Sequence, residues 1–389
     1  MALGDWPALA SPIGAMGAPG VRLVGVSLAV PPRWRLLPAD VAALAQLSKL
    51  WLASDSSARG WQLLPRQLQH LDLSNCLLLN VPTDLAALTQ LSRLSLANNW
   101  VAGGWPHLPQ QLQQLDLSNC HLRLLQLPAE LTALTQLTKL CLAKNTLVAM
   151  DGWQHLPRSL RQLDLSNCHL QRVPAQLADL TQLTALSLSC NNEPFRRPEG
   201  FDLGSLPRQL QHLELSGCGL RHELGTLAHL THLTQLRLDS NPVGSAEQWG
   251  FLERLQQLQR LHLRRCRVRR VPAVLRTLTQ LTSLSLAGNP IQAGWQELPE
   301  QLQQLDLEWC GLWRVPAELA DLTHLQTLRL DRNHITGGWQ QLPRQLRQLM
   351  PRGCGPQLPL VLSPLLAPNF WVPVSQFVCN PPVPRSLLL

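Results

Sequence analysis

The stretch Leu68–Cys76, LQHLDLSNC, decides the fold, because variants of it recur along the chain. Its last six residues, LDLSNC, return letter for letter at Leu115–Cys120 and Leu163–Cys168. In each copy the last two leucines alternate with polar residues, which is the period of a short strand with one buried face. The acid, hydroxyl, amide and thiol are either a reactive cluster or part of a repeating framework, and the spacing between copies decides which.

Two alternating types of nine-residue unit fill most of the chain. The first type resembles LQHLDLSNC and begins at Leu68, Leu112, Leu160, Leu210, Leu258 and Leu302. The second type resembles LTSLSLAGN and begins at Leu47, Leu91, Leu137, Leu183, Leu233, Leu281 and Leu325. Successive units are 21 to 27 residues apart, and weak copies at Leu23 and Leu346 bring the predicted strand units to fifteen. One such strand buries little by itself, so the turns must stack around a shared core.

The pattern L-x-x-L-x-L-x-x-N/C at a period of roughly 20–29 residues resembles the leucine-rich-repeat family. The resemblance covers residues 21–354. It implies an α/β solenoid, a leucine-rich-repeat horseshoe with a parallel concave β-sheet and mostly 3-10 or extended convex segments. Return segments with a Val-Pro, as at Val81–Pro82, are similar to the plant intracellular Ras-group proteins. The shorter returns of the second type are similar to the LPxxL units of bacterial effectors.

Composition and the chain ends set the broader expectations. We divide the chain into an N-terminal extension 1–20, a leucine-rich-repeat domain 21–354 and a Pro-rich C-terminal tail 355–389. The first 21 residues lack Lys and Arg, which argues against a secretory signal, and four prolines in the apolar tail argue against a membrane span. Ten cysteines without a CxxC pair indicate reduced thiols, so we predict a cytoplasmic protein without a cofactor.

The ninth position of the units alternates between Cys and Asn. The cysteines are Cys76, Cys120, Cys168, Cys218, Cys266, Cys310 and Cys354, and the asparagines are Asn99, Asn145, Asn191, Asn241, Asn289 and Asn333. We expect these side chains to turn inward where the chain leaves each strand and to bond buried backbone groups. The cysteines are therefore interpreted as structural, and neither a catalytic nor a metal site is predicted at them.

A second periodic feature is a series of tryptophans seven or nine residues before the first-type units, apart from the unit at Leu210. They are Trp61, Trp105, Trp153, Trp249, Trp295 and Trp339, with Phe201 in the remaining turn. An aromatic ring that recurs at one register is typical of a packed convex ladder.

The outward acids of the first half carry no predicted chemistry. Asp72, Asp116 and Asp164 lie in alternate turns, about 9–10 Å apart, which is too far for a shared-proton dyad. We interpret them as solvated side chains. The histidines of the segment HELGTLAHLTH, residues 222–232, fall in a return loop, and no metal site is predicted there.

The second half breaks this monotony and holds the predicted binding site. Charged residues, a histidine and a tryptophan gather over five adjacent turns, and arginine and tryptophan are enriched in binding hot spots. We call this set the C-terminal concave patch: Arg237, Asp239, Arg260, His262, Arg264, Asp306, Glu308, Trp309, Arg329 and Asp331.

These observations predict a non-catalytic scaffold or adaptor that binds a protein partner on its concave face. The resemblance implies two further possibilities, a regulator of a small GTPase or phosphatase in intracellular signalling, and the substrate-recognition subunit of a ubiquitin ligase. A third alternative is nucleic-acid binding through the run Arg264–Arg270, RRCRVRR. The last is disfavoured because the arginines should fan over both face and rim, with no aromatic stacking pattern beside them.

Overall fold

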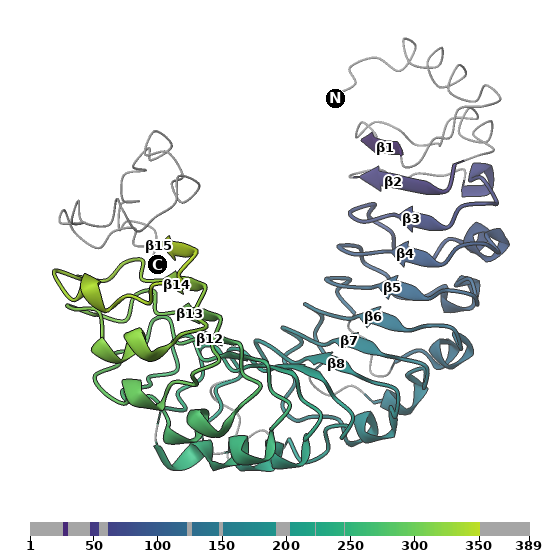
Figure 1. Ribbon diagram of the computed structural model, residues 1–389. Helices are drawn as coiled ribbons and strands as arrows, with labels where there is room; N and C mark the ends of the chain where they lie inside the picture. Colours follow the sequence, from purple (N-terminus) through teal and green to yellow (C-terminus); the bar gives the residue numbers. More distant parts are fainter. Residues whose placement is uncertain are drawn as a thin grey trace, which may run out of the picture.

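The computed structural model describes residues 26–29, 47–53, 61–122, 127–147, 151–191, 203–221, 223–244 and 246–350. Within them, fifteen strands form one parallel sheet whose spatial order is the chain order, and the sheet lines the inside of an open arc (Figure 1). The strands are β1 Val26–Ala29, β2 Lys49–Ala53, β3 His70–Asp72, β4 Arg93–Ser95, β5 Gln114–Asp116, β6 Lys139–Cys141, β7 Gln162–Asp164, β8 Ala185–Ser187, β9 His212–Glu214, β10 Gln235–Arg237, β11 Arg260–His262, β12 Ser283–Ser285, β13 Gln304–Asp306, β14 Thr327–Arg329 and β15 Gln348–Met350. The predicted horseshoe is confirmed, and the weak copies at both ends also form strands.

The strand register follows from the repeat. Leu71 of β3 pairs with Leu94 of β4, which pairs in turn with Leu115 of β5. The same residue of each unit therefore stands beside its equivalent in the next turn. Because side chains alternate across a strand, every fourth-position leucine then points inward and every third- and fifth-position residue points to the concave side.

The return segments on the convex side are short 3-10 helices, as predicted. They are η3 Trp61–Leu63, η4 Thr83–Ala87, η5 Trp105–His107, η6 Ala129–Ala133, η7 Trp153–His155, η8 Ala175–Asp179, η9 Glu223–His229, η10 Ala246–Arg254, η11 Ala273–Thr277, η12 Trp295–Glu297, η13 Ala317–Asp321 and η14 Trp339–Gln341. Pro82 precedes η4 at φ −60°, the angle to which its ring confines it. Gly104 precedes η5 at φ +81°, where an added Cβ would lie 2.5 Å from the Val81 carbonyl oxygen.

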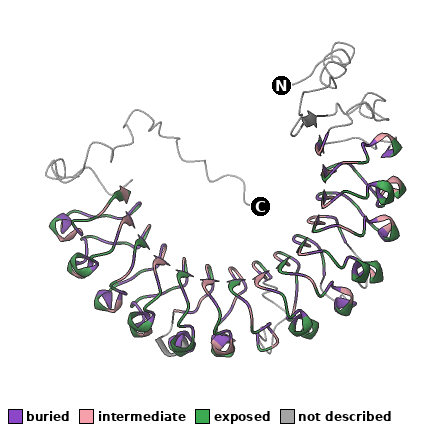
Figure 2. Cartoon of the chain, turned by 45° about the vertical axis from the view of Figure 1, so that its right-hand side comes forward, coloured by how far each residue is buried: buried purple, intermediate pink, exposed green. Residues whose placement is uncertain are grey.

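The core lies between the sheet and these 3-10 turns and runs without a break along the arc (Figure 2). Most of it is leucine, with cysteine, valine and tryptophan at fixed positions of the units, and burial of each leucine contributes about 1.5–3 kcal/mol. The predicted tryptophan ladder is confirmed, since Trp61, Trp105, Trp153, Trp249, Trp295 and Trp339 are at most 9% exposed. Phe201 lies outside the described residues.

The ninth-position residues hold the corners between turns. The Asn99 side-chain oxygen accepts hydrogen bonds from the backbone N–H groups of Cys76 and Leu78, at 2.9 and 3.0 Å. Its amide nitrogen donates to the carbonyls of Leu73 and Leu96, at 2.9 and 2.7 Å. Asn145, Asn191, Asn241, Asn289 and Asn333 repeat this arrangement. One asparagine thus satisfies four buried backbone groups that would otherwise destabilise the turn.

The cysteines also turn inward, as predicted. The Cys120 thiol donates to the Leu96 carbonyl at 3.1 Å, and Cys266 does the same to Leu238. Burial raises the pKa of the Cys120 thiol to about 11 and that of the Cys266 thiol to about 12. Such thiols stay protonated near neutral pH and are poor nucleophiles. Cys354 lies outside the described residues.

Candidate functional site

Glu308 is the centre of the C-terminal concave patch. Its carboxylate lies 3.4 Å from the guanidinium of Arg264, 3.4 Å from that of Arg329 and 3.7 Å from that of Arg332. The Glu308 side chain is only 16% exposed, whereas those of the three arginines are 41–68% exposed. Arg329 also lies 3.8 Å from the Asp331 carboxylate. One mostly buried negative charge therefore orients three cations that come from the turns of β11 and β14.

Small residues in the turn of β12 make this network possible. Arg264 belongs to the turn of β11 and Glu308 to that of β13, so the ion pair crosses the intervening turn. At the crossing point that turn carries Ala287 and Gly288, and a Cβ added to Gly288 would lie 2.8 Å from Arg265 Cγ. Arg265 crosses beside it and places its guanidinium 5.6 Å from the centre of the Trp309 ring, in a cation–π contact.

The other predicted patch residues form separate local contacts. The Asp239 carboxylate accepts a hydrogen bond from the Arg264 backbone N–H at 2.7 Å, and Asp306 accepts one from the Ser285 hydroxyl at 3.0 Å. Arg237 lies 3.5 Å from the Glu214 carboxylate of β9. The predicted set is therefore several small clusters beside the network centred on Glu308.

Two predicted patch residues, His262 and Arg260, stand apart from that network. Burial, reinforced by the positive charge of Arg237, lowers the pKa of His262, so the half-buried ring favours its neutral form. Arg260 is exposed on the concave side of β11.

The first-half acids have a structural role that sequence reasoning missed. One carboxylate oxygen of Asp72, Asp116 and Asp164 accepts a hydrogen bond from the backbone N–H two residues later, at 2.8, 2.8 and 2.9 Å respectively. The interpretation of these acids as merely solvated is therefore incomplete. The sequence signal was the serine two residues after each aspartate. In such an Asx turn the aspartate carboxylate accepts the backbone N–H of the serine where the chain leaves the strand.

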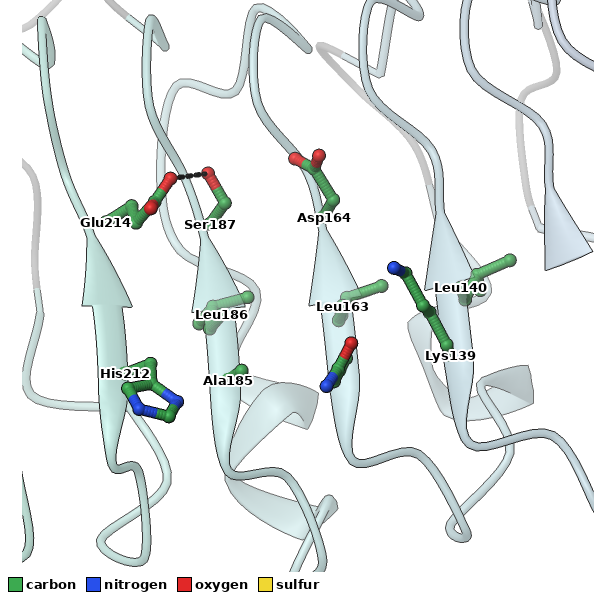
Figure 3. A pocket seen from close by; sticks show the side chains of 10 residues that line it. Lys139, Leu140, Leu163, Asp164, Ala185, Leu186, Ser187, His212 and Glu214 are labelled. Carbon is green, nitrogen blue, oxygen red and sulfur yellow. Dashed lines mark hydrogen bonds between the residues drawn. The ribbon is translucent and has the colours of Figure 1, made fainter. Parts of the chain in front are cut away.

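A notch over β6–β9 is a second candidate site, and the sequence analysis did not single it out (Figure 3). Its floor consists of Leu140, Leu163 and Leu186. Ala185 occupies the third position of β8, where the neighbouring strands carry longer polar side chains, and so leaves a gap. The walls are Lys139, Gln162, Asp164, Ser187, His212 and Glu214.

Polar groups in and beside the notch contact one another. The Ser187 hydroxyl donates to the Glu214 carboxylate at 3.4 Å, and the Cys141 thiol lies 3.7 Å from the Asp164 carboxylate. Burial, with the charges of Asp116 and Asp164, raises the pKa of the Cys141 thiol to about 12, which leaves it protonated. An apolar floor with charges of both signs around it is suited to receive one side chain of a partner.

The histidine-containing segment lies in the return loop, as predicted. It forms η9, where both ring nitrogens of His229 contact backbone carbonyls, those of Thr226 and Leu206. His222 lies outside the described residues. In the described part of the chain, no helix is long and apolar enough to cross a membrane.

Comparisons with known proteins agree with this architecture. Residues 67–88, 111–134 and 159–180 match the Leucine Rich Repeat family, and a search of curated proteins gives no match. A leucine-rich-repeat protein of Leptospira interrogans is 24% identical, with a TM-score of 0.51 over 86% of this chain and 94% of its own. An internalin of Listeria monocytogenes is 20% identical, with a TM-score of 0.54 over 85% of this chain and 90% of its own. A chain of a TLR13–ssRNA13 complex is 24% identical, with a TM-score of 0.61 over 84% of this chain and 51% of its own.

These identities are low, so the three structures establish the fold alone. The matched segments and the horseshoe together show leucine-rich repeats stacked in the leucine-rich-repeat fold. The plant Ras-group subtype remains a prediction.

Proposed function

We propose that the chain is a non-catalytic scaffold that holds a protein partner against its concave face, at the C-terminal concave patch. The observation that carries this proposal is the Glu308 network, which fixes Arg264 and Arg329 on the concave side. Long charged side chains lose rotamer freedom when they bind, and this cost opposes association. Here ion pairs have already restricted them, so a partner with complementary charge meets a preorganised surface.

Two finer roles are versions of this proposal. Regulation of a small GTPase or phosphatase, and substrate recognition for a ubiquitin ligase, both follow from the resemblance noted above. Each needs a protein partner on the same scaffold, so the identity of the bound partner distinguishes them. In both roles the catalytic groups would belong to another protein, and reproducible turnover by the purified chain would contradict the proposal.

Site-specific photo-crosslinking tests where a partner binds. A benzophenone amino acid replaces Arg260, which is exposed on the concave side of β11, or Arg276, which is exposed on the convex turn η11. We expect crosslinks to a small set of proteins from Arg260 and none of the same mass from Arg276. Mass spectrometry of the crosslinked bands identifies the partner.

A charge-reversal control sharpens the same experiment. Arg329→Glu places a second carboxylate beside Glu308, which breaks the network and repels it. We expect this variant to lose the Arg260 crosslink, whereas Arg276→Glu retains it. Equal crosslinking in all three proteins would show that the concave patch is not the contact surface.

A further inference from the structure

The rim beside the last turns has a composition that the Glu308 network does not explain. Over the four turns that follow β11–β14, the chain leaves each strand through the segments 265–270, 288–293, 309–314 and 332–337. These segments contain six arginines, two tryptophans and no acidic residue. We call the eight residues the basic rim: Arg265, Arg267, Arg269, Arg270, Trp309, Trp313, Arg314 and Arg332.

Backbone hydrogen bonds hold these segments side by side. The Gln292 N–H donates to the Arg269 carbonyl at 2.8 Å, and the Thr336 N–H donates to the Trp313 carbonyl at 2.9 Å. At the strand exits, the Gly288 N–H donates to the Glu308 carbonyl at 2.7 Å. The basic rim is therefore one continuous surface on a rigid support.

The side chains of this surface are accessible. All six arginines are exposed, and Trp309 and Trp313 are 55% and 66% exposed. Only Arg332 forms an ion pair among the described residues, through Glu308. The run divides between face and rim, as the sequence predicts: Arg264 pairs with Glu308 on the concave side, and the other arginines of the run are exposed on the rim. The expected lack of aromatic neighbours is wrong, because Trp309 lies under Arg265.

The backbone of the basic rim is also unfavourable for the residues it carries. Four of its residues have φ values of 53–62°: Arg265, Arg267, Trp309 and Arg332. This left-handed region is unfavourable for residues other than Gly, Asn and Asp. The equivalents of Arg265, Trp309 and Arg332 in earlier turns include Asn75, Asn98, Asn119 and Asn167, but also Lys144 and Cys190. The equivalents of Arg267 are Leu77, His121 and His169, at the same sign of φ.

We propose that the basic rim binds a single-stranded nucleic acid. Arginine guanidinium groups pair with phosphate oxygens, and exposed tryptophan rings stack on unpaired bases whatever their sequence. Successive turns are about 5 Å apart, and the segment 288–293 between them carries no arginine, so Arg314 lies two turns, about 10 Å, from the arginines of the β11 turn. A flexible single strand can place different phosphates against these two groups. A flat cationic rim without a groove-reading helix gives little sequence preference.

The basic rim borders the concave patch and shares Trp309 with it, and Arg332 pairs with Glu308. Arg269, Arg270, Trp313 and Arg314 belong to the rim alone, so variants at these residues test this proposal separately from the protein-binding function proposed above.

Fluorescence anisotropy with the full chain tests this proposal. The probes are fluorescein-labelled oligothymidylate and oligouridylate of about 20 nucleotides, at about 50 mM NaCl. The rim variant combines Arg269→Ala, Arg270→Ala and Arg314→Ala. We expect it to weaken binding at least about tenfold and to reduce the slope of log K against log salt by about 2, since each lost phosphate contact removes about 0.7. The matched control replaces Arg66, Arg158 and Arg276, three exposed arginines of the return segments.

A tryptophan pair separates base stacking from charge alone. Trp313→Ala should weaken binding about tenfold without changing the salt slope. Its control is Trp100→Ala. Trp100 is 51% exposed and contacts the ring of His121, as Trp313 contacts that of His334, but its exit segment 98–103 carries no arginine. Both rings are largely outside the core, so neither variant should unfold the chain.

Three results would overturn the proposal. One is no binding of either oligonucleotide at low salt. Another is an equal loss of affinity in the arginine control. The third is binding that Trp313→Ala leaves unchanged and that polyglutamate displaces as well as an oligonucleotide of equal charge. The last result would assign the basic rim to an acidic polypeptide instead.

Discussion

The turns of β3–β8 and those of β11–β14 share one core and differ in their surfaces. Asn145 in the first region and Asn289 in the second accept two backbone N–H bonds and donate to two carbonyls, all within 3.1 Å. At the eighth position of the unit, however, Asn167 is replaced by Arg265 and Trp309. The difference teaches that the leucines and the ninth residue maintain the solenoid, whereas the outward positions diverge without disturbing it.

The largest expected effect tests the shared core. Asn289→Ala leaves the N–H groups of Cys266 and Val268 and two carbonyls without their buried partner. Each buried unsatisfied group costs about 1–3 kcal/mol, so we expect the free energy of unfolding to fall by about 3 kcal/mol or more. Urea denaturation followed by circular dichroism measures the change.

Asn145→Ala is the matched variant in the first region. If the core is equivalent along the arc, the two substitutions lower the free energy of unfolding by the same amount within about 0.5 kcal/mol. A loss confined to one of them would show that the two regions do not share the same corner energetics.

The next effect distinguishes the two concave surfaces. Glu308→Gln removes the negative charge that faces Arg264, Arg329 and Arg332, which then repel one another. We expect a loss of about 1–2 kcal/mol that shrinks in high salt, because the arginines are partly exposed. Urea midpoints at low and high NaCl concentration measure both quantities.

Asp164→Asn makes the same charge change in the first region. The asparagine oxygen can still accept the Ser166 N–H, and no arginine ion pair involves Asp164 in the described residues. We expect a change within about 0.5 kcal/mol. If Glu308→Gln and Asp164→Asn lower the free energy of unfolding equally, the ion pairs of Glu308 do not distinguish the two concave surfaces.

The fold was predictable from sequence because its determinants are local and repeated. Spacing of leucines fixes the strands, and Pro82 or Gly104 fixes where a return turn begins. The Glu308 network was not predictable, because it depends on arginine side chains that cross a turn over Ala287 and Gly288. The notch depends on the absence of a side chain at Ala185. The network and the notch both depend on residues one or two turns apart, about 20–50 positions apart in the sequence. The sequence of a single unit therefore does not reveal them.

A smaller effect tests the strain at the eighth and tenth positions. Arg267 has φ 62° and no ion pair among the described residues, so Arg267→Asn substitutes a residue that tolerates this conformation. We expect a gain of about 0.5–1 kcal/mol in stability together with weaker oligonucleotide binding. Asn167→Arg, which places an arginine at the eighth position of a first-region turn at φ 53°, should lose a similar amount. If neither substitution changes the free energy of unfolding, backbone strain does not distinguish the two regions.

The smallest effect concerns acid sensitivity and the histidines of the two concave surfaces. The pKa of His262 is lowered by burial and by Arg237, and that of His70 by burial and by Arg93. In the unfolded chain each returns to a pKa near 6.5, so the unfolded state binds more protons below that pH. Their contribution to stability is therefore complete above about pH 6.5 and declines as the pH falls through the lowered folded-state pKa. His262→Gln should lose less stability than the unmodified chain between about pH 7.5 and pH 5, as urea midpoints across that range would show. Positive charges reinforce the lowered pKa at both histidines, Arg237 and Arg264 at His262 and Arg93 and Lys49 at His70, and the acids Asp239 and Asp306 oppose it at His262. His70→Gln, measured in the same way, shows which of the two regions is the more acid-sensitive.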